Sequence, residues 1–520
     1  MRNTMQGNLI KNILACLVLV ALCFVLGAQA AEDVKTSIVF LAGIAGLVFM
    51  FILGTRIWVL FFLLPPLLLV VPLPGPFAHV SVELYTGLIV LPSWVLMWSM
   101  GYVKFRWRSI LILDILVLLL MAYIVATFIR RPVAINVIGL DSDDIGGADY
   151  VYAIFASTYY LGMSCIPMEH GKLAKVLRWS VPLFLAGVAL KCGINIARYG
   201  SVAIFSDALD SQVSYLFLLG VKGITYIYVA YSLTSILVNP LLIVSSAFCC
   251  LSAMLCGGRA SFMELFTTLT AVSFIKREFL VCFMLGLMAL GGIYTLSAVS
   301  TLESLPYGVQ RVFTMLPGLN LNQHAARSAA GTWQWRLDLW DMAFDERTGY
   351  INDYVFGDGF GQSRSATERR GRALMRGEYV YGQDLDEFAV NGVWHNGVIT
   401  TIHRLGYVGL GIISFILIVG NVLLFRTCMA LRGTPLFLPV VFYVCNFVGF
   451  VPLFCWGHAD LKTFLETFVP LSLIKLAYCE AREAGLIKPW FRRGHYVPQM
   501  IQEYERRGGL EVGADVMRMK

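Results

Sequence analysis

The stretch SILILDILVLLLMAYIVATFI, residues 109–129, decides the fold class of this chain, and Asp114 is its only charged residue. A run of about 20 apolar residues is long enough to cross the hydrocarbon core of a membrane as an α-helix. A lone span must be helical, because unpaired backbone groups cost several kcal/mol each in lipid. Over all 520 residues, 58% are hydrophobic and 14% are charged, whereas soluble domains carry about 25% charged residues. The composition therefore excludes a soluble globule, a disordered chain and a fibre.

Similar apolar runs recur along the chain and predict an all-α polytopic membrane protein with about 14 transmembrane helices. We expect these spans at residues 9–29, 37–54, 57–74, 82–101, 109–129, 150–167, 179–198, 214–238, 240–257, 261–275, 279–299, 397–425, 435–457 and 461–479. The chain then divides into an N-terminal helical part (1–299, about 11 helices), a large loop (300–396), a C-terminal helical part (397–479, about 3 helices) and a tail (480–520).

Lysine and arginine predict the orientation of the spans, because they gather in cytoplasmic loops. They occur in alternate short loops, at Arg56, Lys104, Arg106, Arg108, Lys172, Lys175, Arg178, Lys276, Arg277, Arg426 and Arg432. Both termini are therefore expected in the cytoplasm and the 300–396 loop outside it, with Arg130 and Arg131 as the exceptions to the alternation. Residues 1–30 also fit a cleavable signal peptide that ends near Ala30, although a retained first helix is our preferred interpretation.

The net charge and the cysteines do not indicate a nucleic-acid partner, a disulfide framework or a zinc site. The net charge of +7 is largely explained by the loops that orient the spans, so it does not indicate nucleic acid. The twelve cysteines lie almost entirely inside apolar runs and form no CxxC spacing. We interpret them as small buried residues rather than as a disulfide framework or a zinc site.

The 300–396 loop is the predicted functional region, since loops of this length are usually functional or disordered. Trp333, Arg336, Leu337, Trp340 and Phe344 recur at three- and four-residue spacing, which predicts an amphipathic helix. All basic residues of the loop are arginines, and five of them lie between 364 and 376. Arginine meets phosphate oxygens two at a time, so the pattern favours an anionic ligand such as a lipid headgroup, a pyrophosphate or an acidic glycan. A solvated basic face remains the alternative.

Three short motifs border or lie within this loop. Arg259 follows two glycines at the junction of two spans, where an arginine either meets a lipid phosphate or reaches the headgroups without further function. Gly357-Asp358-Gly359-Phe360-Gly361 is not placed like a dinucleotide site, and it is typical of a turn with permissive backbone. His395 precedes a span. Imidazole suits a general base, although a single histidine at a helix start is more often a capping or packing residue.

Ionisable residues inside predicted spans are functional candidates by default, or else structural ion pairs. They are Asp114, Lys191, Lys222, Glu264, His403, Arg404 and Glu466.

Taken together, three pieces of the chain over roughly 240–425 resemble the bacterial O-antigen ligase and O-antigen polymerase family. They are Cys256 to Ala260, then Arg336 to Trp340 with Gly357 to Gly361, and His395-Asn396 with Leu405 to Leu410. The chain departs from the family pattern at two places: Gly258 stands where a serine is expected, and the arginine-rich segment 364–376 is added. These departures bear on the identity of the acceptor more than on the family.

The resemblance implies glycan transfer at the outer face of the bacterial inner membrane, without metal or other cofactor. The implied donor is a glycan on undecaprenyl pyrophosphate, and the acceptor is a second lipid-linked glycan or lipid A–core. It implies catalytic roles for His395, Arg336 and Arg259. Membrane lipid and a chain-length regulator are the further expected partners, and nucleic acid is not one.

Residues expected to contact substrate are Arg364, Arg369, Arg370, Trp340 and Asn396. Trp333, Trp335 and Trp340 either stack on sugars or anchor the loop at the membrane interface. The number of spans and the added arginines favour a polymerase of O-antigen or exopolysaccharide. A ligase is the alternative within the family, and a transporter of an anionic lipid-linked glycan is the alternative from another class.

Overall fold

The computed structural model describes the central and C-terminal parts of the chain. The described residues are 82–102, 110–133, 147–166, 181–187, 190, 211–255, 259–298, 302, 305, 307–316, 318–319, 321–345, 350–360, 388–389, 392, 394–434, 437–456, 464–465 and 467–487. The predicted spans 9–29, 37–54 and 57–74, most of 179–198, the signal-peptide alternative and the tail from 488 onward lie outside these residues.

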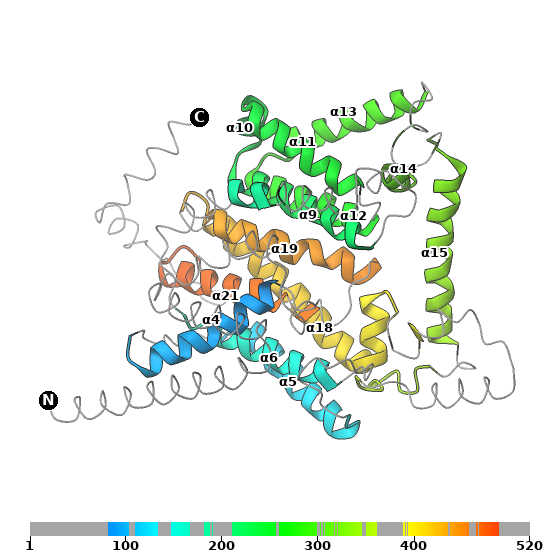
Figure 1. Cartoon of the computed structure of the whole chain (residues 1–520). Helices are drawn as coiled ribbons and strands as arrows, with labels where there is room; N and C mark the ends of the chain where they lie inside the picture. The colour runs from blue at the N-terminus through cyan, green and yellow to red at the C-terminus, as the bar shows by residue number, and fades with distance from the viewer. Residues whose placement is uncertain are drawn as a thin grey trace, which may run out of the picture.

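The described part is all-helical, as the apolar runs predict (Figure 1). Its helices are α4 (Val82–Ser99), α5 (Ile112–Arg130), α6 (Gly147–Met163), α9 (Ser211–Ala230), α10 (Leu233–Val238), α11 (Pro240–Leu255), α12 (Arg259–Lys276), α13 (Phe279–Ala298), α14 (Tyr307–Phe313), α15 (Gln323–Phe344), α18 (Gly397–Ala430), α19 (Phe437–Trp456) and α21 (Phe468–Glu483). The predicted 214–238 span is interrupted at Tyr231–Ser232, where α9 ends and Ser232 caps α10.

Three of the described helices are long and apolar enough to cross a membrane: Ile112–Arg130 of α5, Gly397–Ala430 of α18 and Phe437–Cys455 of α19. Shorter apolar stretches cover Pro240–Ala253 and Phe279–Thr295. Large apolar side chains also lie exposed on α11 and α13, including Leu241 at 72% and Met288 at 71% exposure. A helix that exposes such side chains along its length suits an apolar solvent, so the described helices support a membrane protein.

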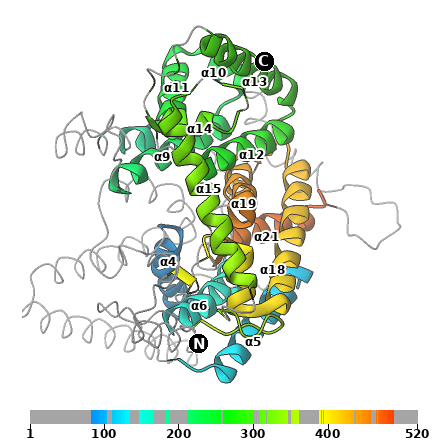
Figure 2. The same ribbon diagram turned by 90° about the vertical axis from the view of Figure 1, so that its right-hand side faces the viewer.

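The helices form two packed groups that share α19. In one group α9 packs on α11 and α12, and α12 packs on α19; in the other α18 packs on α5 and α21, and α6 joins α5 to α21. α15 runs along one side of both groups, from α14 at one end to the start of α18 at the other (Figures 1 and 2). This position places the predicted amphipathic helix where it can contact both groups.

A buried ion pair joins α5 to α21 in the second group. Lys475 Nζ lies 2.7 Å from Asp114 Oδ1, and both side chains are at least nine-tenths buried. Tyr160 of α6 donates to Asp114 Oδ1 at 2.8 Å, and the backbone N–H of Leu111 donates to Oδ2 at 2.7 Å. Asp114 therefore belongs to a buried, hydrogen-bonded ion pair. This agrees with the structural ion pair that was one of the two interpretations of Asp114 from the sequence.

Candidate functional site

α15 carries Arg336 on a face that receives two other arginines. Arg259, the first residue of α12, donates from Nη2 to the carbonyl oxygen of Ala329 at 2.9 Å. Arg311, in α14, donates from Nη2 to Thr332 Oγ1 at 3.3 Å. Positions 329, 332 and 336 are three and four residues apart, so they lie on one helix face. Guanidinium groups from α12 and α14 thus contact the face of α15 that carries Arg336.

Burial and neighbouring positive charge both act on these side chains. Burial lowers the pKa of Arg336, and the positive charge of Arg311 lowers it further. Burial also lowers the pKa of Arg259, with additional contributions from Arg311 and Arg336. The neighbouring charges that act on both groups are positive, so this stretch of α15 concentrates positive charge and favours an anion.

His395 lies beside the same part of α15. Its ring packs edge-on against Trp335, with 5.2 Å between ring centroids, and against Phe388 at 4.8 Å. Arg336 is the next residue after Trp335, about 100° further around the helix. The backbone of His395 has φ of +48°, a left-handed conformation that is uncommon outside glycine and that clusters at functional sites.

The residues on either side of His395 fix its position. Trp394 is fully buried, and its carbonyl oxygen accepts a hydrogen bond from Trp340 Nε1 at 3.0 Å. Asn396 caps α18 through Oδ1, which accepts from the N–H groups of Val398 and Ile399, while its Nδ2 donates to Cys455 O at 3.0 Å. Trp340 and Asn396, both predicted to contact substrate, therefore hold the His395 segment between α15 and α19.

The GDGFG motif lies against a break in α18. Gly406 interrupts this helix with φ of +66° and ψ of −175°. Across the break, Tyr407 N–H donates to Tyr354 O at 2.8 Å, and Asp358 N–H donates to His403 O at 2.7 Å. The loop thus satisfies the backbone groups that a broken membrane helix would leave unpaired.

Glycine is required on both sides of this contact. A Cβ on Gly357 would lie 2.5 Å from Arg404 O, and one on Gly406 would lie 2.2 Å from Val355 O. Gly357 and Gly359 also have φ near +80°, at +77° and +86°. These angles confirm the interpretation of the motif as permissive backbone.

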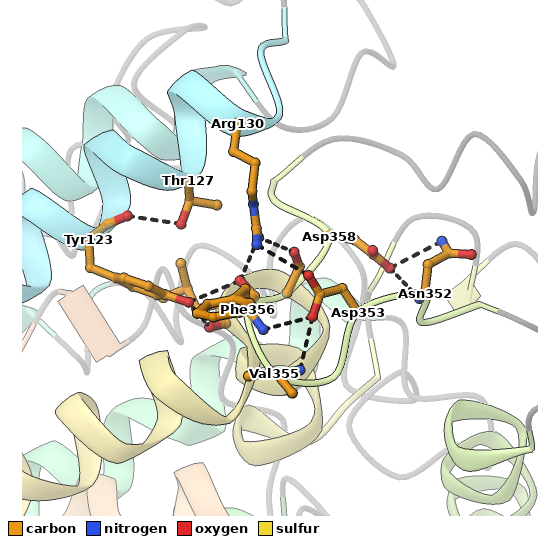
Figure 3. Close-up of polar contacts among 10 residues, drawn as sticks. Tyr123, Thr127, Arg130, Asn352, Asp353, Val355, Phe356 and Asp358 are labelled. Carbon is orange, nitrogen blue, oxygen red and sulfur yellow. Dashed lines mark hydrogen bonds and ion pairs between the residues drawn. The ribbon is translucent and has the colours of Figure 1, made fainter.

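α5 holds this loop from the other side (Figure 3). Arg130 Nη2 donates to Phe356 O at 2.7 Å and to Gly357 O, and Nη1 lies 3.2 Å from Asp353 Oδ2. The single hydroxyl proton of Tyr123 is shared between two carbonyl oxygens, since Oη lies 2.8 Å from Leu405 O and 3.0 Å from Phe356 O. Arg130, an exception to the charge alternation of the loops, thus has a structural partner in the 353–357 segment.

His403 is a second histidine near this loop, and it is enclosed. It is fully buried and accepts a hydrogen bond at Nδ1 from Trp394 Nε1 at 3.0 Å. Its Nε2 lies 3.9 Å from Asp358 Oδ2. Nδ1 is thus engaged by Trp394, whereas Nε2 forms no hydrogen bond within the described residues. The complete enclosure of the ring favours a structural role and leaves His395 as the candidate base.

Several of the residues predicted from the sequence lie outside the part of the chain that the structure describes. Arg364, Arg369 and Arg370 lie outside the described residues, as do Lys191 and Glu466. Among the described residues, no group of three or more His, Cys, Asp or Glu side chains is placed to hold a metal ion.

The sequence does not single out Arg311 or Arg130 as site residues. Arg311 was one of nine loop arginines, and no local pattern separates it from the rest. Arg130 carried a signal, since it departs from the charge alternation of the loops. Comparison with protein-family models, with curated proteins and with solved structures finds no match.

Proposed function

We propose that this chain is a metal-independent membrane glycosyltransferase similar to the bacterial O-antigen polymerases and ligases. It would cross the inner membrane about 14 times, with both termini in the cytoplasm and the 300–396 loop in the periplasm. Its donor would be a glycan on undecaprenyl pyrophosphate, and its acceptor a second lipid-linked glycan, so that O-antigen or exopolysaccharide grows. The observation that carries the proposal is the convergence of Arg259 and Arg336 on one stretch of α15 that His395 also contacts.

The chemistry of the transfer fits these residue types. An acceptor hydroxyl attacks the anomeric carbon, and its oxygen forms the new glycosidic bond as the bond to the pyrophosphate oxygen breaks. The electron pair of the broken bond remains on the pyrophosphate, and the hydroxyl proton passes to His395. Arg259 and Arg336 stabilise the charge that grows on the leaving group, as preorganised donors do in other transfer reactions.

A reconstituted assay tests the proposal. The full-length protein in lipid nanodiscs receives an undecaprenyl-pyrophosphate-linked oligosaccharide, and products are separated by size. We expect chains of increasing length, with the rate reduced about 10²–10⁴-fold in His395→Ala and strongly reduced in Arg336→Ala. Arg327→Ala is the matched control, because Arg327 is exposed on the same helix and, within the described residues, hydrogen-bonds only to Gln323.

The other outcomes separate the alternatives. A single transfer onto added lipid A–core would identify a ligase, which would use the same residues. Movement of the lipid-linked glycan across a sealed bilayer without a new glycosidic bond would identify a transporter. Folded His395→Ala and Arg336→Ala proteins that transfer glycan at the wild-type rate would refute the assignment of the site.

A further inference from the structure

Arg311 is held in a fixed place beside α15 by the packing of α14. Val309 and Phe313 are buried with Leu302 in a small apolar cluster. The side chain of Gln310 links the two helices, since Nε2 donates to Leu305 O at 2.8 Å and Oε1 accepts from Asn322 N–H at 3.1 Å. Asn322 is the N-cap of α15. The short helix is thus tied to α15 at the residue next to Arg311.

Arg311 is also the charged neighbour that the other two arginines share. Its positive charge lowers the pKa of both Arg259 and Arg336, and its guanidinium bonds Thr332, one turn from Arg336. Like charges placed this close raise the local positive potential, which favours a bound anion. An anion that contacts all three guanidinium groups would be stabilised by each of them.

We propose that Arg311 is a third anion-binding residue of this site and that it makes the site prefer a diphosphate to a monophosphate. This inference rests on the proposed function. A single phosphate group is small enough to be held by two guanidinium forks, whereas a diphosphate presents a second phosphoryl group that needs further donors. Because the leaving pyrophosphate gains negative charge during transfer, a third guanidinium stabilises the transition state more than the bound donor.

Binding of two short isoprenoid probes tests the inference without any transfer reaction. Farnesyl diphosphate and farnesyl monophosphate are titrated calorimetrically into the full-length protein in nanodiscs at low salt, which limits screening. We expect the wild-type protein to favour the diphosphate. Arg311→Ala should weaken diphosphate binding about 10–100-fold, the range for a charged hydrogen bond, and should change monophosphate binding little.

Two further variants make the result specific. Arg311→Lys retains the charge and the α14 packing but loses the planar fork, so its diphosphate affinity should lie between those of the wild type and Arg311→Ala. Arg327→Ala should bind both probes as the wild type does, because Arg327 is an exposed arginine of the same helix bonded to Gln323.

The possible failures are distinguishable. If Arg311→Ala and Arg311→Lys keep the wild-type preference while Arg336→Ala loses diphosphate binding, the role of Arg311 is refuted and the proposed function stands. If the wild-type protein binds neither probe, the arginine clamp itself is refuted, and the proposed function loses its basis together with the role of Arg311.

Discussion

Gly406→Ala should destabilise the protein by roughly 3–5 kcal/mol, because the change acts on the break in α18 in two ways. The backbone of Gly406, at φ +66° and ψ −175°, lies in a region that is essentially restricted to glycine, and a side chain there costs of order 1–3 kcal/mol. The new Cβ would also lie 2.2 Å from Val355 O, which is backbone and cannot rotate away.

The clash forces the loop and the helix apart and removes further contacts. The bonds from Tyr407 N–H to Tyr354 O at 2.8 Å and from Val408 N–H to Val355 O at 3.2 Å would be lost. Each such bond contributes about 1 kcal/mol net. The matched control is Gly411→Ala, since Gly411 lies in the same helix with no atom within 4 Å of a Cβ. Alanine there should be neutral or stabilising by up to about 1 kcal/mol.

The assay is denaturation of the purified variants by increasing sodium dodecyl sulfate in mixed micelles, followed by tryptophan fluorescence. Hydrogen–deuterium exchange of peptides that cover 353–359 and 403–408 gives the local readout. We expect an earlier midpoint and faster exchange in Gly406→Ala alone. If Gly406→Ala and Gly411→Ala both unfold and exchange like the wild type, the loop does not pack against the break as described, and our reasoning fails.

Three further predictions concern charged groups. Arg336→Lys should impair glycan transfer while Arg327→Lys should not, because an ammonium group does not replace a planar fork; equal transfer rates in the two variants would contradict this. Asp114→Asn should destabilise the protein by about 3–5 kcal/mol, since it leaves a buried Lys475 charge uncompensated, and Asp114→Asn combined with Lys475→Met should recover much of the loss in the same denaturation assay. Burial raises the pKa of Asp358, so its contribution to stability is complete at acidic pH and declines as the pH rises through the folded-state pKa. The midpoint should therefore fall less with rising pH in Asp358→Asn than in the wild type, and parallel pH profiles would exclude this role.

Most of the described helices could be predicted, because the length and hydrophobicity of a segment are properties of that segment alone. The 109–129 run corresponds to α5, the 240–257 run to α11 and the spaced tryptophans to α15. The interruption between α9 and α10 was not predicted, since the apolar composition continues through it. The break at Gly406 was not predicted either, because a single glycine in a helix is common and only the partner loop reveals its conformation.

The site was predictable in its residue types but not in its assembly. Arginine, histidine and tryptophan in a long loop of an apolar chain indicated an anionic ligand and a candidate base. Nothing local indicated that Arg259 and Arg311 would meet the same face of α15, because their contacts with Ala329 and Thr332 span 70 and 21 residues.

Hydrophobic content and the length of apolar runs can be read directly from the residue order, and they indicate a helical protein suited to a membrane. The sequence also identified Arg259, Arg336 and His395 as candidates. The packing of the helices determines which ionisable residues are enclosed and which lie close together. It pairs Asp114 with Lys475 and encloses His403 between Trp394 and Asp358. The physical reason is that the partners of a buried polar group are set by the packing of distant helices, which no short stretch of sequence encodes.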